Sequence, residues 1–228
     1  MSGTTLPRPP GVLAGAAAIW TKEMLVEARA RYSIGASIVF AAVTLAVLSY
    51  TAGPQARRPE TAAVLLWMVL LFSATASLSH AFGREVEGGT WDLLRHATGP
   101  GEVLLGKWLA GATVLVAIEA LVLAGGALLV APPVGHPAGL AAVLGAGTVT
   151  LAIGLPVVAA LLAQARHHGG LAAALAFPVL VPGLFAAVSG TRRALEGVWP
   201  GSELRVLVSF AGVLAIAGWR LFVFLWED

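Results

Sequence analysis

The sequence predicts an all-α integral membrane protein with six transmembrane helices, and its composition and apolar patterning lead to that fold class. Hydrophobic residues make up 58% of the 228 residues and charged residues only 11%, with a mean hydropathy of +0.86. So few polar residues cannot cover the surface of a soluble core. Six apolar runs approach the roughly 20 residues that a helix needs to cross a bilayer.

The predicted spans occupy residues 33–52, 61–83, 108–131, 139–163, 170–189 and 206–226. No link between them is long enough for a separate soluble domain, so residues 14–228 are predicted to form one membrane domain. Residues 1–13, which are rich in proline and glycine, are predicted to be a disordered tail. A signal peptide is the alternative for this end of the chain, because Arg8 precedes a weakly apolar stretch. The basic residues that follow, at Lys22 and Arg29, favour a segment that stays inside.

The distribution of charge predicts the orientation of the chain. With six spans both termini lie on one side, and nine of the 14 Lys and Arg residues fall on that side. By the positive-inside rule the termini are therefore cytoplasmic. The basic residues form no clustered face, which argues against nucleic-acid binding. The chain has no cysteine, which excludes disulfides, thiolate metal sites and thioether-linked cofactors.

The segment before the first span, from Ala14 to Arg31, is predicted to be a helix at the cytoplasmic surface of the membrane. Trp20, Met24 and Ala28 share a stripe at helical spacing, and Trp20 is the predicted membrane anchor. The charged residues of this interfacial helix are Lys22, Glu23, Glu27 and Arg29. Glu23 interrupts the apolar face. The alternative is a plain cytoplasmic extension of the first span.

Proline and glycine predict irregular, closely packed helices in the second half of the chain. Pro156 in the fourth span and Pro178 and Pro182 in the fifth predict kinks. The small residues of the fourth span are Gly145, Gly147 and Gly154, and they predict close approach of neighbouring helices. Such residues are also common in spanning helices that do not move. Residues 191–199 are predicted to form a short helix on the outer surface.

Glu119 is the one acid deep inside a predicted span, near the middle of the bilayer. A carboxylate there costs several kcal/mol unless it is neutralised or paired. We therefore expect Glu119 to be protonated or to face Thr148, Thr150 or another polar group. Its role is either functional or that of a structural hydrogen bond between helices.

The polar stretch from Arg84 to Lys107 is predicted to carry a short cytoplasmic helix. Thr90 can cap this helix, with Asp92 in its first turn, and Gly99 and Pro100 stop it. The helix would present an apolar surface made by Trp91 and Leu94, and exposed residues of this kind usually contact a partner. The alternative is a solvated loop whose tryptophan lies among lipid headgroups.

Several motifs, taken in their order along the chain, resemble those of a known family. Glu-x-Glu-x-Gly-Thr at residues 85–90, followed by Leu94 and by Gly106-Lys107, resembles the cytoplasmic coupling region of ABC-2-type permeases. Further matches are Lys22-Glu23 with Glu27 and Arg29, Glu119-Ala120-Leu121, the PVLVP stretch at 178–182 and the Phe-x-Phe-Leu-x-Glu motif at 222–227. Together they resemble the heme exporter protein B family, CcmB.

The resemblance implies a permease subunit of an ABC transporter for cytochrome c maturation in the bacterial cytoplasmic membrane. Its implied partners are a CcmA-like ATPase subunit, a second copy of the chain, a CcmC-like heme-handling protein and a CcmE-like heme chaperone. Heme is a possible cargo, and no tightly bound cofactor is implied. The implied ATPase-coupling residues are Glu85, Glu87, Gly89, Thr90, Trp91, Asp92 and Leu94. Gly88 departs from relatives that have an acid at this position.

Two apparent motifs do not support chemistry in this chain. Gly101 to Lys107 fits the start of a phosphate-binding loop, but Trp108 stands where Ser or Thr must bind magnesium, and no strand precedes the segment. The five histidines are dispersed, which argues against a metal site or a paired heme ligand. We therefore predict a non-enzymatic transporter subunit whose partner hydrolyses ATP. The alternatives are an ABC-2-type exporter of another substrate and a non-transporting assembly scaffold.

Overall fold

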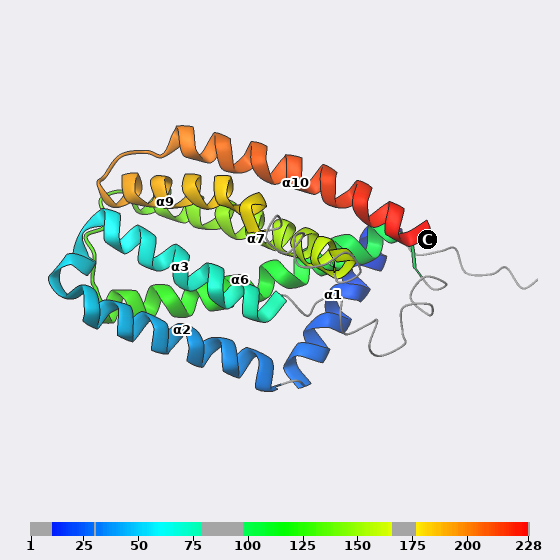
Figure 1. Ribbon diagram of the computed structural model, residues 1–228, viewed down its shortest axis with the longest axis horizontal. Helices are drawn as coiled ribbons and strands as arrows, with labels where there is room; N and C mark the ends of the chain where they lie inside the picture. Colours follow the sequence, from blue (N-terminus) through cyan, green and yellow to red (C-terminus); the bar gives the residue numbers. More distant parts are fainter. Residues whose placement is uncertain (1–10, 30, 79–97, 166–176, 228) are drawn as a thin grey trace, which may run out of the picture.

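The computed structural model describes residues 11–29, 31–78, 98–165 and 177–227, and every element in these ranges is helical (Figure 1). The elements are α1 (Val12–Arg29), α2 (Arg31–Ala52), the 3₁₀ helix η1 (Gly53–Arg57), α3 (Pro59–Leu78), α6 (Pro100–Leu129), α7 (Pro137–Ala165), the 3₁₀ helix η2 (Phe177–Leu180), α9 (Val181–Leu195) and α10 (Gly201–Glu227). The predicted all-α class is confirmed for the described part of the chain.

The long helices lie side by side in an elongated bundle, and α1 crosses one end of it (Figure 1). This end, called the α1 end below, also holds the start of α6 and the end of α10. The opposite end, called the η1 end, holds η1 and the links from α6 to α7 and from α9 to α10. The helix α6 runs between the two ends and is about 45 Å long at 1.5 Å per residue.

The core of the bundle is apolar and tightly packed around Trp67 of α3. This side chain is fully buried, and its Nε1–H donates a hydrogen bond of 2.8 Å to Oγ1 of Thr191 in α9. Gly147 of α7 makes room for the ring, because a Cβ there would lie 2.0 Å from Trp67 Cη2. Gly154 is equally constrained by Leu180, whereas Gly145 faces open space. The predicted close approach is therefore confirmed at Gly147 and Gly154 and wrong at Gly145.

Within the described ranges, four helical segments are long and apolar enough to cross a membrane. They are Ile38–Arg57, Pro100–Leu129, Pro137–Val158 and Gly201–Phe224, and Pro59–Thr75 is a shorter apolar helix. Length and composition thus support a multi-pass membrane protein. The predicted fifth span, 170–189, lies partly outside the described residues. The helix α9 that continues it has 15 residues and is shorter than a full crossing requires.

Several predicted boundaries differ from the structure at the helix ends. The helix α6 begins at Pro100, eight residues before the predicted start at residue 108, because Pro at the first position and Glu102 in the first turn suit a helix start. The helix α1 begins at Val12, inside the predicted disordered tail, whose residues 1–10 lie outside the described ranges.

The prediction of a separate surface helix at 191–199 is wrong, because α9 continues without a break to Leu195. Thr191 is buried against Trp67 rather than exposed. The chain then turns at Gly197, whose φ of +87° favours glycine. The three prolines that predicted kinks do not all lie inside α-helices. Pro156 lies inside α7, as predicted, and Pro178 lies in the 3₁₀ helix η2. Pro182 lies in the first turn of α9, a position that tolerates proline.

Candidate functional site

The predicted coupling element lies outside the described residues. This holds for all of its members, Glu85, Glu87, Gly89, Thr90, Trp91, Asp92 and Leu94. The chain re-enters the described ranges at Thr98 and begins α6 at Pro100. The first two turns of α6 are therefore the nearest described structure downstream of the predicted element, and they pack against α1.

The contact between α1 and the start of α6 depends on two glycines. We call it the α1–α6 junction and define it by Gly15, Ile19, Glu23, Glu102, Gly106 and Lys107. A Cβ on Gly15 would lie 2.4 Å from Glu102 Oε2, and a Cβ on Gly106 would lie 2.5 Å from Ile19 Cβ and 2.9 Å from the carbonyl oxygen of Ala16. No side chain larger than hydrogen fits at either position without movement.

Apolar side chains from a third helix close the junction. Ile19, Val103, Leu104 and Phe222 of α10 form a buried cluster, with Trp108 packed against it. The terminal motif of the chain therefore contributes Phe222 to the same site as the N-terminal helix. Three segments that are far apart in the sequence thus meet where α6 begins.

A buried ion pair lies at the centre of the junction. Lys107 is only 2% exposed, and its Nζ lies 3.2 Å from Glu23 Oε1. Lys22 Nζ lies 3.0 Å from the same oxygen. Burial alone would raise the pKa of Glu23, but the nearby ammonium groups of Lys107 and Lys22 outweigh it and lower the pKa below its ordinary value. Glu23 is therefore ionised at neutral pH, which satisfies the charge of Lys107.

The exit from the predicted coupling element is tied to this junction. The backbone N–H of Gly99 donates to Glu102 Oε2 over 3.4 Å, and the Glu102 side chain packs on Gly15 of α1. The same carboxylate therefore contacts the residue that precedes α6 and the helix α1.

The face of α1 that packs against α6 is distinct from the predicted stripe of Trp20, Met24 and Ala28. Gly15, Ile19 and Glu27 are buried, at spacings of four and eight residues, whereas Trp20 is 36% exposed. The Nε1–H of Trp20 donates to Thr113 Oγ1 of α6 at 3.0 Å. Glu23, interpreted from sequence as an interruption of the apolar face, lies on the packing face because Lys107 balances its charge. Arg29 is exposed at the end of the helix.

Glu119 lies in α6 opposite α7, and the Thr148 hydroxyl donates a hydrogen bond to its Oε2. The expected contact with Thr148 is therefore confirmed. Thr150, the other polar group considered, donates instead to the carbonyl oxygen of Ala146 in its own helix, at 2.8 Å. The carboxyl of Glu119 is partly buried and joins the middle of the two helices.

The described residues lend no support to a nucleotide or metal site. Gly101 to Lys107 lies inside α6 with Lys107 buried against Glu23, so this segment forms no phosphate-binding loop. His136 accepts a hydrogen bond of 3.0 Å from the backbone N–H of Gly139 and packs at 5.4 Å on the ring of Trp199. The other four histidines lie outside the described ranges. Within those ranges no group of three His, Asp or Glu residues could bind a metal ion.

A helical bundle with several apolar helices long enough to span a bilayer defines a multi-pass membrane protein. The chain matches the model of the family described as CcmB protein over residues 15–221. It belongs to the CcmB family. It is also similar to heme exporter protein B of Rhodobacter capsulatus, with 27% identity over 187 residues, covering 79% of this chain and 84% of that protein. No solved structure matches the chain significantly.

Proposed function

We propose that this chain is the permease subunit of an ABC-type system that serves heme export or release of a heme-loaded chaperone in cytochrome c maturation. Membership of the CcmB family over residues 15–221 is the observation that carries the proposal. The name of the relative, heme exporter protein B, supports heme as the cargo. ATP hydrolysis then belongs to a separate partner subunit, and this chain converts its motion into motion of membrane helices.

The proposed topology has six spans with both termini in the cytoplasm of the bacterial inner membrane. The charge asymmetry supports this orientation, and the α1 end of the bundle is then the cytoplasmic end. The helix α1 lies at the membrane interface, where Trp20 and Arg29 are exposed. A second copy of the chain, a CcmC-like protein and a CcmE-like chaperone complete the assembly.

The proposed mechanism is mechanical coupling through the α1–α6 junction. The segment 84–95, with Trp91 and Leu94 as its apolar surface, binds the ATPase differently in its two nucleotide states, because equal affinity would shift no equilibrium. The movement then passes through Gly99 and Glu102 to α6 and α1, which the glycine contacts and the ion pair bind into one unit. Tight packing favours transmission, since a loose contact would absorb the displacement.

The test is Trp91→Ala in a strain that makes cytochrome c and whose only copy of this chain carries the substitution. We expect normal membrane insertion and a fall in cytochrome c of about tenfold, as for loss of a buried anchor residue at an interface. Trp199→Ala is the matched control, because Trp199 is an exposed tryptophan at the η1 end, and it should leave production unchanged. Normal production in Trp91→Ala would favour an assembly scaffold, and normal production after deletion of the chain would favour an exporter of another substrate.

A further inference from the structure

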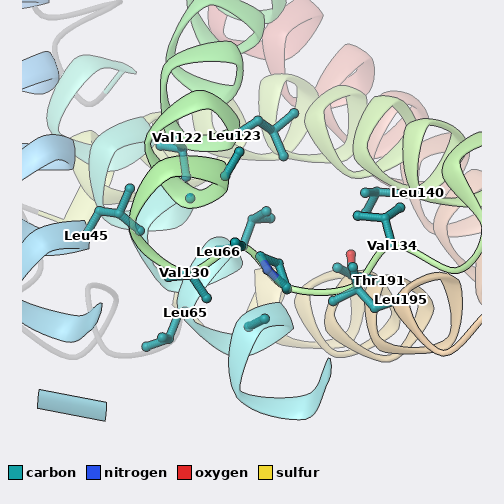
Figure 2. A pocket seen from close by; sticks show the side chains of 15 residues that line it. Leu45, Leu65, Leu66, Val122, Leu123, Val130, Val134, Leu140, Thr191 and Leu195 are labelled. Carbon is teal, nitrogen blue, oxygen red and sulfur yellow. The ribbon is translucent and has the colours of Figure 1, made fainter. Parts of the chain in front are cut away.

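A cavity of about 320 Å³ lies at the η1 end of the bundle, and no residue of the α1–α6 junction lines it. Figure 2 shows its lining side chains from close by. Leu45 of α2, Leu65 and Leu66 of α3, and Val122 of α6 line one part of it, and Leu195 of α9 lines another. Among the described residues that line it, the only hydroxyl belongs to Thr191, which already accepts the hydrogen bond from Trp67. Water would find few partners in such a space, so the cavity suits an apolar ligand.

Small residues of α6 create this space. A Cβ on Gly125 would lie 2.7 Å from Leu45 Cδ2, but a Cβ on Gly126 would meet nothing within 4 Å. The adjacent glycine therefore allows close packing of α2, while Gly126 faces unfilled volume. Ala62 and Ala127 complete the small-residue lining on this side.

The cavity opens toward the outside of the bundle. Ala127, Ala131 and Val134 belong to its wall and are exposed, and the neighbouring Leu128 is 86% exposed. Of these residues Ala127 and Leu128 belong to α6, and Ala131 and Val134 to the link that follows it. In a multi-pass membrane protein such an exposed apolar surface can face lipid. A lipid chain can therefore reach the cavity, where it would gain van der Waals contacts.

Positive charge lies at the same end. The Nε–H of Arg57 donates to the carbonyl oxygen of Val130, which lines the cavity, at 3.2 Å. This bond uses one of the five guanidinium donors, and exposed Arg58 adds a second cation. Glu60 in the first turn of α3 offsets one of the two charges, which leaves this corner with a net positive charge. A phosphate suits such a pair of arginines.

The depth of the cavity in the bilayer agrees with a lipid whose headgroup lies at the η1 end. Leu45 precedes Gly53 by eight residues, so it lies about 12 Å below η1 at 1.5 Å per residue. One leaflet of the hydrocarbon core is about 15 Å thick, half of the whole. A chain whose headgroup lies beside Arg57 can therefore fill the cavity without leaving its own leaflet.

We infer that this cavity binds one acyl chain of an anionic membrane phospholipid, with the phosphate held by Arg57 and Arg58. The inference needs only the membrane location of the bundle and does not rest on heme transport or on ATPase coupling. Bound lipid joins α2, α3, α6, α7 and α9 at the end of the bundle where direct side-chain packing is incomplete.

The test is native mass spectrometry of the full chain, released with its co-purifying partners from bilayer discs of phosphatidylglycerol and phosphatidylcholine with identical acyl chains. The wild type should retain one phospholipid per chain and prefer phosphatidylglycerol about tenfold, as for a charge-assisted phosphate contact. Gly126→Leu should lose the lipid by filling its space. Gly212→Leu is the control, since Gly212 of α10 also faces open space but lies outside the cavity.

The double variant Arg57→Gln/Arg58→Gln should retain a lipid but lose the headgroup preference. Equal retention of both lipids by the wild type, or retention by Gly126→Leu equal to that of the control, would overturn the inference. A second measurement does not require the Gly126→Leu variant to fold. The chain has no native cysteine, so a photo-crosslinker attached to Ala127→Cys is the single label, and it lies at the opening of the cavity. A phospholipid adduct supports the inference, whereas a cross-linked second copy or a detergent adduct alone contradicts it.

Discussion

The two ends of α6 differ in how closely neighbouring side chains pack against the helix. At its start, Gly106 lies in direct contact with Ile19, and Lys107 is buried beside Glu23. At its end, Gly126 faces a cavity. Gly106 therefore serves close packing at one end of the helix, whereas Gly126 leaves free volume at the other. The α1 end is tightly packed around the ion pair, while the η1 end has unfilled volume that could bind a ligand.

The largest effect should come from breaking the buried ion pair. Lys107→Ala removes the more buried of the two cations beside Glu23, while Lys22 remains 3.0 Å from that carboxylate. We therefore expect a loss of about 3 kcal/mol in the free energy of unfolding, at the lower end of the range for a broken buried pair. Reversible unfolding in mixed micelles measures this loss. The double variant Glu23→Leu/Lys107→Met should recover most of it, because apolar groups then replace both members of the ion pair. Equal destabilisation of the single and double variants would show that packing, not charge, dominates at this position.

The next largest effects should come from matched glycine substitutions at the two ends of α6. Gly106→Ala forces a methyl group against Ile19 and the Ala16 carbonyl oxygen, so we expect a loss of about 1–3 kcal/mol from overpacking. Gly126→Ala should instead stabilise by about 0.5–1 kcal/mol, because the helix gains alanine without a clash. The same unfolding assay compares them. If both substitutions changed the free energy of unfolding in the same direction, the inferred difference in packing between the two ends of α6 would be contradicted.

A smaller effect is expected where the core borders the cavity. Thr191→Val keeps the shape of the side chain but removes the acceptor of the Trp67 indole N–H. We expect a loss of about 1–2 kcal/mol, since that buried donor is then unsatisfied. A change in the red-edge excitation shift of tryptophan fluorescence should accompany this loss of stability. Thr113→Val, which removes the acceptor of exposed Trp20, is the control and should cost less.

The smallest effect should be a pH dependence of the α1–α6 junction. The ammonium groups of Lys107 and Lys22 outweigh burial and hold the folded-state pKa of Glu23 below its ordinary value. The carboxylate therefore stabilises the folded state at pH values above the ordinary pKa of a glutamate, and this contribution disappears as pH falls through the lowered folded-state pKa. The difference in melting temperature between the wild type and Glu23→Gln should shrink over that acidic range. A constant difference from neutral to acidic pH would contradict the ionised state of Glu23.

Helices and intramembrane pairing could be predicted from sequence where one physical constraint dominates. Long apolar runs must form helices in lipid because every backbone polar group needs a partner, and the expected contact of Glu119 with Thr148 followed from the cost of an isolated carboxylate. Sequence alone did not identify the face of α1 that packs on α6, because the partner of Glu23 lies 84 residues away. A regular spacing of Gly15, Ile19, Glu23 and Glu27 was the available signal.

The remaining features depend on three-dimensional fit. The cavity beside Gly126 exists because α2, α3 and α9 leave a gap there, and local sequence does not encode such a gap. Thr191 was expected on the surface because arginines follow it, yet its own side chain points to Trp67. The predicted coupling element lies outside the described residues, so its roles stay predictions.

The position of Glu119 along α6 has a geometric consequence. It lies 19 residues after Pro100 and 10 residues before Leu129, and its bond to Thr148 fixes that point against α7. If α6 rotates as a rigid rod about this fulcrum, its two arms are about 28 Å and 15 Å long. A displacement at the start of the helix then arrives at the other end reversed in direction and reduced by about half.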